Sequence, residues 1–264
     1  MFLKKNESAS IGPPECQRRV ADATPDNQLQ KEKMFIGHYA VALAAKKVAP
    51  KTSLGTLFVS AQLLDLLFPI LALLGLEHVR PDPGNTAFTP YDFYDYPISH
   101  SLVTSIAWSI AFGLIYFAIR RDRKGSWVLG ICVLSHWILD AISHGPDMPI
   151  APGLSAYVGL GLWNSVPATV VVEGAMFVVG VILYIRTTVA KDRTGTYAFW
   201  GLITFLALVY AANAINREPA SESMMGIVGL AALIIIFWAY WIDRHRGVPV
   251  VAELAKEDAR PSSA

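Results

Sequence analysis

The chain has 264 residues, of which 53% are hydrophobic and only 16% are charged, and its formal net charge at pH 7 is +1. A soluble domain has roughly a quarter of its residues charged, so this composition excludes an ordinary soluble protein. The near-neutral charge gives no sign of nucleic-acid binding. Cys16 lies in a polar segment and Cys132 in an apolar one, so a disulfide framework is not indicated.

The first segment, residues 1–33, is polar and of mixed charge, and it lacks the apolar stretch of a signal peptide. This composition is typical of a disordered extension. The apolar segment MFIGHYAVALAA follows at 34–45. It is short for a complete span, so we expect a helix that is tilted, interfacial or re-entrant.

Six longer apolar runs follow, each about the 17–24 residues that a helix needs to cross roughly 30 Å of hydrocarbon. They occupy 53–76, 101–119, 126–143, 165–185, 197–215 and 226–242. The expected fold is all-α: a polytopic membrane helical bundle of about six transmembrane helices preceded by a short N-terminal apolar helix. The expected divisions are the extension at 1–33, a transmembrane domain at 34–243 and a cytoplasmic tail at 244–264.

Basic residues alternate between the loops that join these runs. Lys and Arg gather before the first run, between the second and third, between the fourth and fifth, and after the sixth. The segments 77–100, 145–164 and 216–225 contain one or none. Because short basic loops stay in the cytoplasm, the pattern predicts a multi-pass membrane protein with a cytoplasmic C-terminus.

The stretch VLSHWILDAISHGPD, at 133–147, carries three ionisable side chains four residues apart, His136, Asp140 and His144. At 100° per residue they spread over about 80° of one helix face, so all three can point into one cavity. Imidazoles and carboxylates are ligands of zinc and similar divalent metals. The alternative for any one of them is a helix–helix hydrogen bond, and His144 could simply end its helix before Gly145.

Four more ionisable residues fall in the same outer part of the membrane. Glu173 lies about 12 Å below the outer end of its helix, and Asp65 lies about 15 Å below the outer end of its own. His100 and His38 lie at or near the outer starts of helices that run inward. The common depth and the ligand chemistry predict a shared divalent-metal site, with Zn²⁺ favoured.

Four segments, MFIGHYAVALAAKKVAP, AQLLDLLFP, YPISHS and SHWILDAISH, resemble the membrane-bound metal-dependent hydrolase family, also described as LexA-binding, inner-membrane-associated hydrolases. The resemblance covers roughly residues 34–175 and implies hydrolase activity, an inner-membrane location and Met34 as the true start. The family pattern runs His, Asp, His–Ser and then His-x-x-x-Asp. It matches His38, Asp65, His100–Ser101, His136 and Asp140.

The same order is similar to the zinc ligands of the all-α zinc-dependent phospholipase C and single-strand nuclease superfamily. In that comparison His144 matches a further histidine, whereas the closing histidine is replaced by Thr169, so only Glu173 remains of the last motif. The hydrolase family also often has a second Asp beside Asp65, where this chain is apolar. These departures imply one or two ions rather than three.

The features together predict a membrane-embedded, metal-dependent hydrolase of an ester or phosphoester, with lipids and other amphiphiles as candidate substrates. Asp65 or Glu173 is expected to act as the general base. The expected metal ligands are His38, Asp65, His100, His136, Asp140, His144 and Glu173. One alternative is an ion- or proton-coupled transporter, which the few ionisable groups in the inner halves of the helices disfavour. The other is a non-catalytic membrane protein that recruits partners and holds a structural metal.

Overall fold

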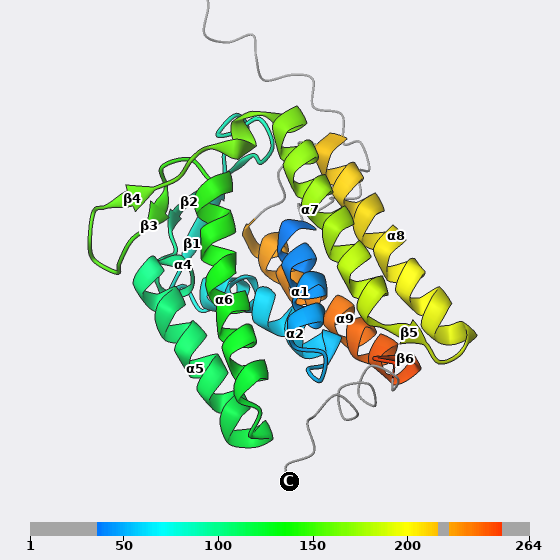
Figure 1. Ribbon diagram of the computed structural model, residues 1–264. Coiled ribbons are helices and arrows are strands. Elements are labelled where there is room, and N and C mark those ends of the chain that lie inside the picture. Colours follow the sequence, from blue (N-terminus) through cyan, green and yellow to red (C-terminus); the bar gives the residue numbers. More distant parts are fainter. Residues whose placement is uncertain (1–35, 216–221, 250–264) are drawn as a thin grey trace, which may run out of the picture.

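The computed structural model describes residues 36–215 and 222–249, most of which are helical (Figure 1). The α-helices are α1 (Ile36–Val48), α2 (Leu54–Ala61), α3 (Leu63–Leu73), α4 (Pro97–His100), α5 (Leu102–Arg120), α6 (Arg123–Ser143), α7 (Val166–Thr187), α8 (Arg193–Ile215) and α9 (Glu222–His245), and η1 (Leu162–Asn164) is a 3₁₀ turn. The predicted extension at 1–33 and most of the predicted tail lie outside the described residues.

The described part of the chain also contains six short strands, which the expected all-α class does not include. They are β1 (His78–Pro81), β2 (Tyr91–Asp95), β3 (Met148–Pro149), β4 (Tyr157–Val158), β5 (Val189–Ala190) and β6 (Arg246–Gly247). Each pairs antiparallel with one other strand, in the order β1–β2, β3–β4 and β5–β6. The first five strands lie in segments between helices, and β6 directly follows α9, so the strand pairs join these segments to one another without changing the helical character of the fold.

Among the described residues, four helices, α5, α6, α7 and α8, are long and apolar enough to cross a membrane. The pair α2 and α3 would make a fifth span bent by 56°. The sixth predicted run, 226–242, falls within α9. The side chains in the first part of this helix are not among those that the structure describes. The structure therefore has the helices of a membrane protein, but the described residues do not establish six spans.

The run 53–76, which is expected to form one transmembrane helix, is divided into the two helices α2 and α3. α2 ends at Ala61 and α3 begins at Leu63, because Gln62 between them leaves the helical conformation, with φ −107° and ψ 9°. Pro69 lies further along, inside α3, so it does not make this break. The bend turns the start of α3, which carries Asp65, away from the axis of α2.

The short helix α1 lies in the middle of the bundle, where it packs against α2, α6 and α7 (Figure 1). Tyr39, Ala42 and Leu43 of α1 have no exposed surface. α7 approaches closely at Gly180, where a Cβ atom would lie 2.5 Å from the carbonyl oxygen of Ala40. Small residues allow such close contacts between membrane helices. The sequence predicts that this segment is tilted, interfacial or re-entrant. The burial of α1 disfavours the interfacial position.

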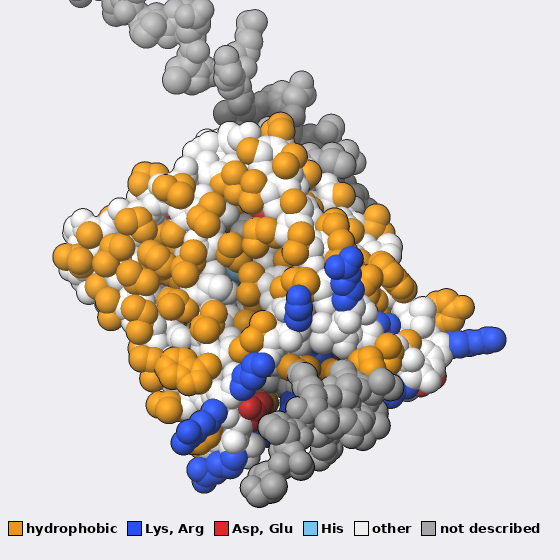
Figure 2. Space-filling view, in the orientation of Figure 1, with side chains coloured by type: hydrophobic (Ala, Val, Ile, Leu, Met, Phe, Trp, Pro, Cys, Tyr) orange, Lys and Arg blue, Asp and Glu red, His pale blue; other side chains and the backbone are white. Residues whose placement is uncertain are grey.

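The outer flank of the bundle is hydrophobic. α5 packs on α6 through small residues, and the Ser109 hydroxyl donates to the carbonyl of Gly130 at 2.7 Å. Most of the rest of α5 is exposed and apolar, with Leu114 62% exposed and Ile119 73% exposed. Figure 2 shows hydrophobic side chains over much of one face, with Lys and Arg in its middle and lower parts. A surface this apolar would be unfavourable in water and is expected next to lipid.

Candidate metal centre

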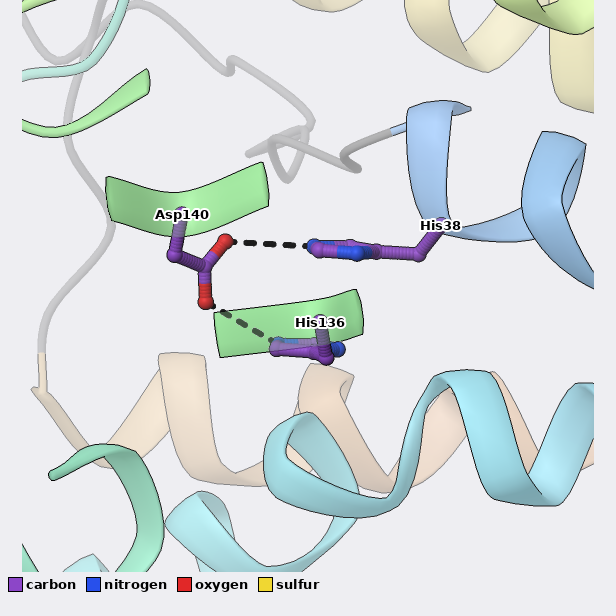
Figure 3. A group of neighbouring side chains, drawn as sticks. All are labelled: His38, His136 and Asp140. Carbon is purple, nitrogen blue, oxygen red and sulfur yellow. Dashed lines mark ion pairs between the residues drawn. The ribbon is translucent and has the colours of Figure 1, made fainter. Parts of the chain in front are cut away.

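Two side chains of α6 and one of α1 form the first part of the centre (Figure 3). His136 and Asp140 lie one turn apart on the buried face of α6, and His38 reaches them from the first turn of α1. The Nε2 atoms of His38 and His136 lie 3.2 and 3.1 Å from the two different carboxylate oxygens of Asp140. The two imidazole rings are stacked, with centroids 3.7 Å apart and planes 1° apart.

A second group shares His136 with the first. Oδ1 of Asp65 lies 3.4 Å from Nε2 of His136 and 3.5 Å from Nε2 of His100, at the end of α4. In each group the candidate ligand atoms all lie within 4.8 Å of one another. Five of the seven predicted ligands thus meet, and they come from α1, α3, α4 and α6.

The remaining two predicted ligands, His144 and Glu173, belong to neither group. His144 caps the end of α6, where Nδ1 lies 3.2 Å from Oδ1 of Asp147 and the ring lies against Trp163, with centroids 4.2 Å apart. Glu173 is fully buried on α7. Its carboxylate is surrounded by the side chains of Tyr210 and Trp163 and the backbone amide of Ile36. Both residues are therefore buried outside the two groups, and Trp163 lies next to each of them.

The break between α2 and α3 orients His136. Nδ1 of His136 lies 2.7 Å from the carbonyl oxygen of Ala61, the last residue of α2. A carbonyl only accepts hydrogen bonds, so Nδ1 carries the proton that it donates. In the neutral ring the lone pair is then on Nε2, which faces the two aspartates. Hydrogen bonds of this kind orient the histidine ligands of metal sites.

A buried acid that the sequence analysis did not single out, Glu77, orients His100 in the same way. Glu77 is 1% exposed, and its Oε1 accepts hydrogen bonds from the backbone amides of Ile98 and Ser99, each at 2.7 Å. The Ser99 hydroxyl donates to Oε2 of Glu77 at 2.6 Å and accepts from Nδ1 of His100 at 2.6 Å. The lone pair of neutral His100 is therefore also on Nε2. No sequence signal separates Glu77 from a solvated acid in a loop.

Ser101, which the family resemblance pairs with His100, has a local structural role. Its side chain accepts a hydrogen bond from the backbone amide of Thr104 and caps the N-terminus of α5. The cap separates α4 from α5 and leaves His100 at the end of α4, facing α3 and α6.

The donor set fits a divalent cation. Nε2 of His136 is buried and has no hydrogen-bond partner among the described residues, although it faces both aspartates. Lone pairs directed at carboxylates repel them unless a cation or a proton lies between. Protonation of both His38 and His136 would bring two positive rings into a 3.7 Å stack. Neutral imidazoles with carboxylates are the ligands that zinc and similar metals prefer.

The shared histidine limits how many ions the groups can hold. One imidazole lone pair binds one ion, so His136 can serve only one of the two groups at a time. A carboxylate has two oxygens that can bind separate ions. Asp140 already presents one oxygen to His38 and the other to His136. The arrangement suits one ion, or two that share Asp140.

Asp65 is the most exposed of the five residues that form the two groups. The side chain of Asp65 is 43% exposed, whereas those of His38, His100, His136 and Asp140 are at most 7% exposed. The aromatic rings of Phe68 and Tyr96 lie beside His100, with centroid distances of 6.0 and 5.4 Å. Among the residues of the two groups, Asp65 is therefore the one that solvent reaches most.

Comparisons with protein-family models, with curated proteins and with solved structures found no match to this chain. The resemblance to the membrane-bound metal-dependent hydrolases rests on the quoted segments alone and stays a prediction.

Proposed function

We propose that this chain is a membrane-embedded, metal-dependent hydrolase with Zn²⁺ as the favoured ion, acting on an ester or phosphoester. The observation that carries the proposal is the meeting of three Nε2 atoms and two carboxylates from four separate helices. Two of these histidines are oriented by hydrogen bonds that leave Nε2 available as a ligand. In a cluster with a purely structural role, buried acceptors are paired with hydrogen-bond donors. Here the Nε2 lone pairs and the carboxylate oxygens that face one another are all acceptors, which a bound cation would satisfy.

The residues of the centre have two proposed roles, metal binding and proton transfer. His38, His100, His136 and Asp140 are the buried groups that would hold the ion. The ion, when bound, would polarise the scissile group and lower the pKa of a bound water. Asp65, the exposed member, lies where substrate enters and is placed to accept a proton from the attacking water. Glu173 is the second candidate for that base.

The surroundings favour a substrate with an apolar part. The centre lies within a bundle whose outer flank is hydrophobic, and the rings of Phe68 and Tyr96 lie close to His100. Such rings bury the apolar part of a ligand while the polar group faces the ion. We infer that a lipid or another amphiphilic ester is the substrate class and that the inner membrane is the location.

The experiment compares purified Asp140→Ala and Asp140→Asn proteins with the parent. Elemental analysis should show bound zinc in the parent and little in either variant, and hydrolysis of a panel of carboxylic and phosphate esters should be lost with it. The matched control is Asp95→Ala, because Asp95 is also an aspartate beside a histidine, His78, but its side chain is 51% exposed.

Two results would contradict the proposal. Unchanged zinc in folded Asp140 variants would remove the metal centre. Zinc that is present in the parent and lost in the variants, with no ester hydrolysed by the parent, would instead indicate a structural metal.

A further inference from the structure

The β3–β4 hairpin (148–160), between α6 and α7, exposes apolar side chains. Leu154 is 52% exposed, Tyr157 is 52% exposed and Leu160 is 81% exposed. From Met148 to Val172 the sequence has no Lys, Arg, Asp, Glu or His. Proteins in water rarely expose such a group of apolar side chains, and its presence indicates contact with a membrane or another protein.

The two strands of the hairpin have different surroundings. Both residues of β3, Met148 and Pro149, are buried, and Sδ of Met148 accepts a hydrogen bond from the hydroxyl of Tyr96 at 3.1 Å. Both residues of β4, Tyr157 and Val158, are exposed, although successive side chains of a strand point to opposite faces. β3 therefore attaches the hairpin to the protein, whereas β4 presents apolar side chains on both of its faces.

The apolar surface of the hairpin continues onto α5. The backbone amide of Val103, in the first turn of α5, donates to the carbonyl of Ile150, directly after β3, at 3.1 Å. Val103 is itself exposed, as are Ile106 and Ile110 further along the same helix. Figure 2 shows hydrophobic side chains over the region in which Figure 1 draws β3, β4 and α5. The hairpin thus extends the flank of α5 that is expected next to lipid.

The length of α5 indicates the depth at which the hairpin would lie. The apolar part of α5, from Val103 to Ile119, rises about 24 Å along the helix axis. The hydrocarbon core of a bilayer is roughly 30 Å thick. The hairpin lies beside the first turn of α5, so it adds apolar surface at the edge of the hydrocarbon core. Tyrosine, here Tyr157, is enriched at this boundary.

The backbone of the hairpin has hydrogen-bond partners within the protein, as a segment in contact with lipid requires. β3 and β4 pair antiparallel with each other. The amide of Ile150 donates to the carbonyl of Ala156 at 3.0 Å. The amide of Leu160 donates to the carbonyl of Ala141, on α6, at 2.8 Å. Pro152, near the tip, has no amide proton to satisfy.

We propose that the β3–β4 hairpin lies in the interfacial layer of the lipid bilayer, with the side chains of Leu154, Tyr157 and Leu160 in contact with acyl chains. A bilayer is favoured over a second copy of the chain because the surface is continuous with that of α5, which is long and apolar enough to cross a membrane. The hairpin has no charged side chain beyond Met148, so the contact requires neither an anionic headgroup nor a metal ion.

The test measures the depth of nitroxide spin labels on the full-length protein in phosphatidylcholine vesicles. Single cysteines are introduced by Leu154→Cys and Leu160→Cys in a Cys16→Ser background, in which the remaining Cys132 is buried. Oxygen is concentrated in lipid, whereas a nickel chelate stays in water, so the ratio of a label's accessibilities to the two reagents reports its depth. The ratio at both positions should be several-fold higher than at a position in water.

Two matched variants calibrate the ratio. Asp95→Cys places a label on the charged β1–β2 hairpin, where the side chain of Asp95 is 51% exposed, and Ile110→Cys places one on the exposed face of α5. Ratios for the two hairpin labels equal to that of Asp95→Cys would show that the hairpin lies in water and overturn the proposal. Low accessibility to both reagents would show that protein covers the hairpin and would also overturn it. Bound zinc is measured in every variant, so failure of the metal centre is scored separately.

Discussion

Replacing Glu77 with glutamine should weaken zinc binding at the centre, although Glu77 is in neither group of candidate ligands. Its Oε2 atom accepts the hydroxyl proton of Ser99, and this leaves Ser99 Oγ to accept the proton on Nδ1 of His100. A glutamine keeps one oxygen for the amides of Ile98 and Ser99 but presents an NH₂ group to the hydroxyl. The hydroxyl must then donate to His100, which moves the ring proton to Nε2.

The size of the loss in zinc affinity follows from the loss of Nε2 of His100 as a ligand. Nε2 of His100 faces Asp65 and Asp140 at 3.5 and 3.7 Å, and once protonated it can no longer be a ligand. Loss of an orienting partner of a metal ligand costs about 10–100-fold in affinity, or about 1.4–2.8 kcal/mol. We expect a change in this range for Glu77→Gln. Ser99→Ala should cost less, because it removes the acceptor of Nδ1 without placing a donor against it.

The assay is a zinc competition titration against a chromogenic chelator, made on the parent, Glu77→Gln and Ser99→Ala in the same detergent. Thermal unfolding of the metal-free proteins controls for folding. An affinity for zinc in Glu77→Gln equal to that of the parent would refute the assigned ring tautomer. An affinity lower in Ser99→Ala than in Glu77→Gln would also refute it.

Two further predictions concern the contacts that α1 makes with its neighbours. Gly180→Ala should lower stability by about 1–3 kcal/mol, because its Cβ atom would meet the backbone of Ala40 at 2.5 Å, whereas a Cβ atom at Gly174 on the same helix meets nothing within 4 Å. Thermal unfolding of both variants checks this, and equal midpoints would contradict the close approach of α1 and α7. Asp243→Ala should cost about 3–5 kcal/mol, because it leaves the buried ammonium group of Lys46 without its carboxylate. The double variant with Lys46→Met should recover part of the loss in a denaturant titration, and strictly additive losses would show that the pair does not interact.

The membrane character and the approximate positions of the long helices could be read from the chain. Apolarity sustained over the length of a span is a local property, and it needs no knowledge of the neighbours. The predicted run 126–143 corresponds to α6 at Arg123–Ser143, and 165–185 corresponds to α7 at Val166–Thr187. The four-residue spacing of His136 and Asp140 is equally local, because helix geometry alone places them on one face.

The meeting of His38, Asp65 and His100 with that face was anticipated from their depth and from the family resemblance. Depth alone does not say which way a side chain points. The same reasoning predicts His144 and Glu173 at the centre, and neither belongs to the two ligand groups. His144 turns toward Asp147 and Trp163 because its helix ends there and its backbone leaves the α6 axis.

Residue types and their periodicity thus account for the bundle and for most of the candidate ligands. The folded arrangement alone reveals the break at Gln62, the role of Glu77 and the lone pairs that face the centre. The physical reason is that these features depend on partners far away in the chain: the carbonyl that orients His136 is 75 positions from it, and Glu77 is 22 positions from Ser99. Hydropathy and helical spacing report on near neighbours, whereas a hydrogen bond between distant segments exists only after they have packed together.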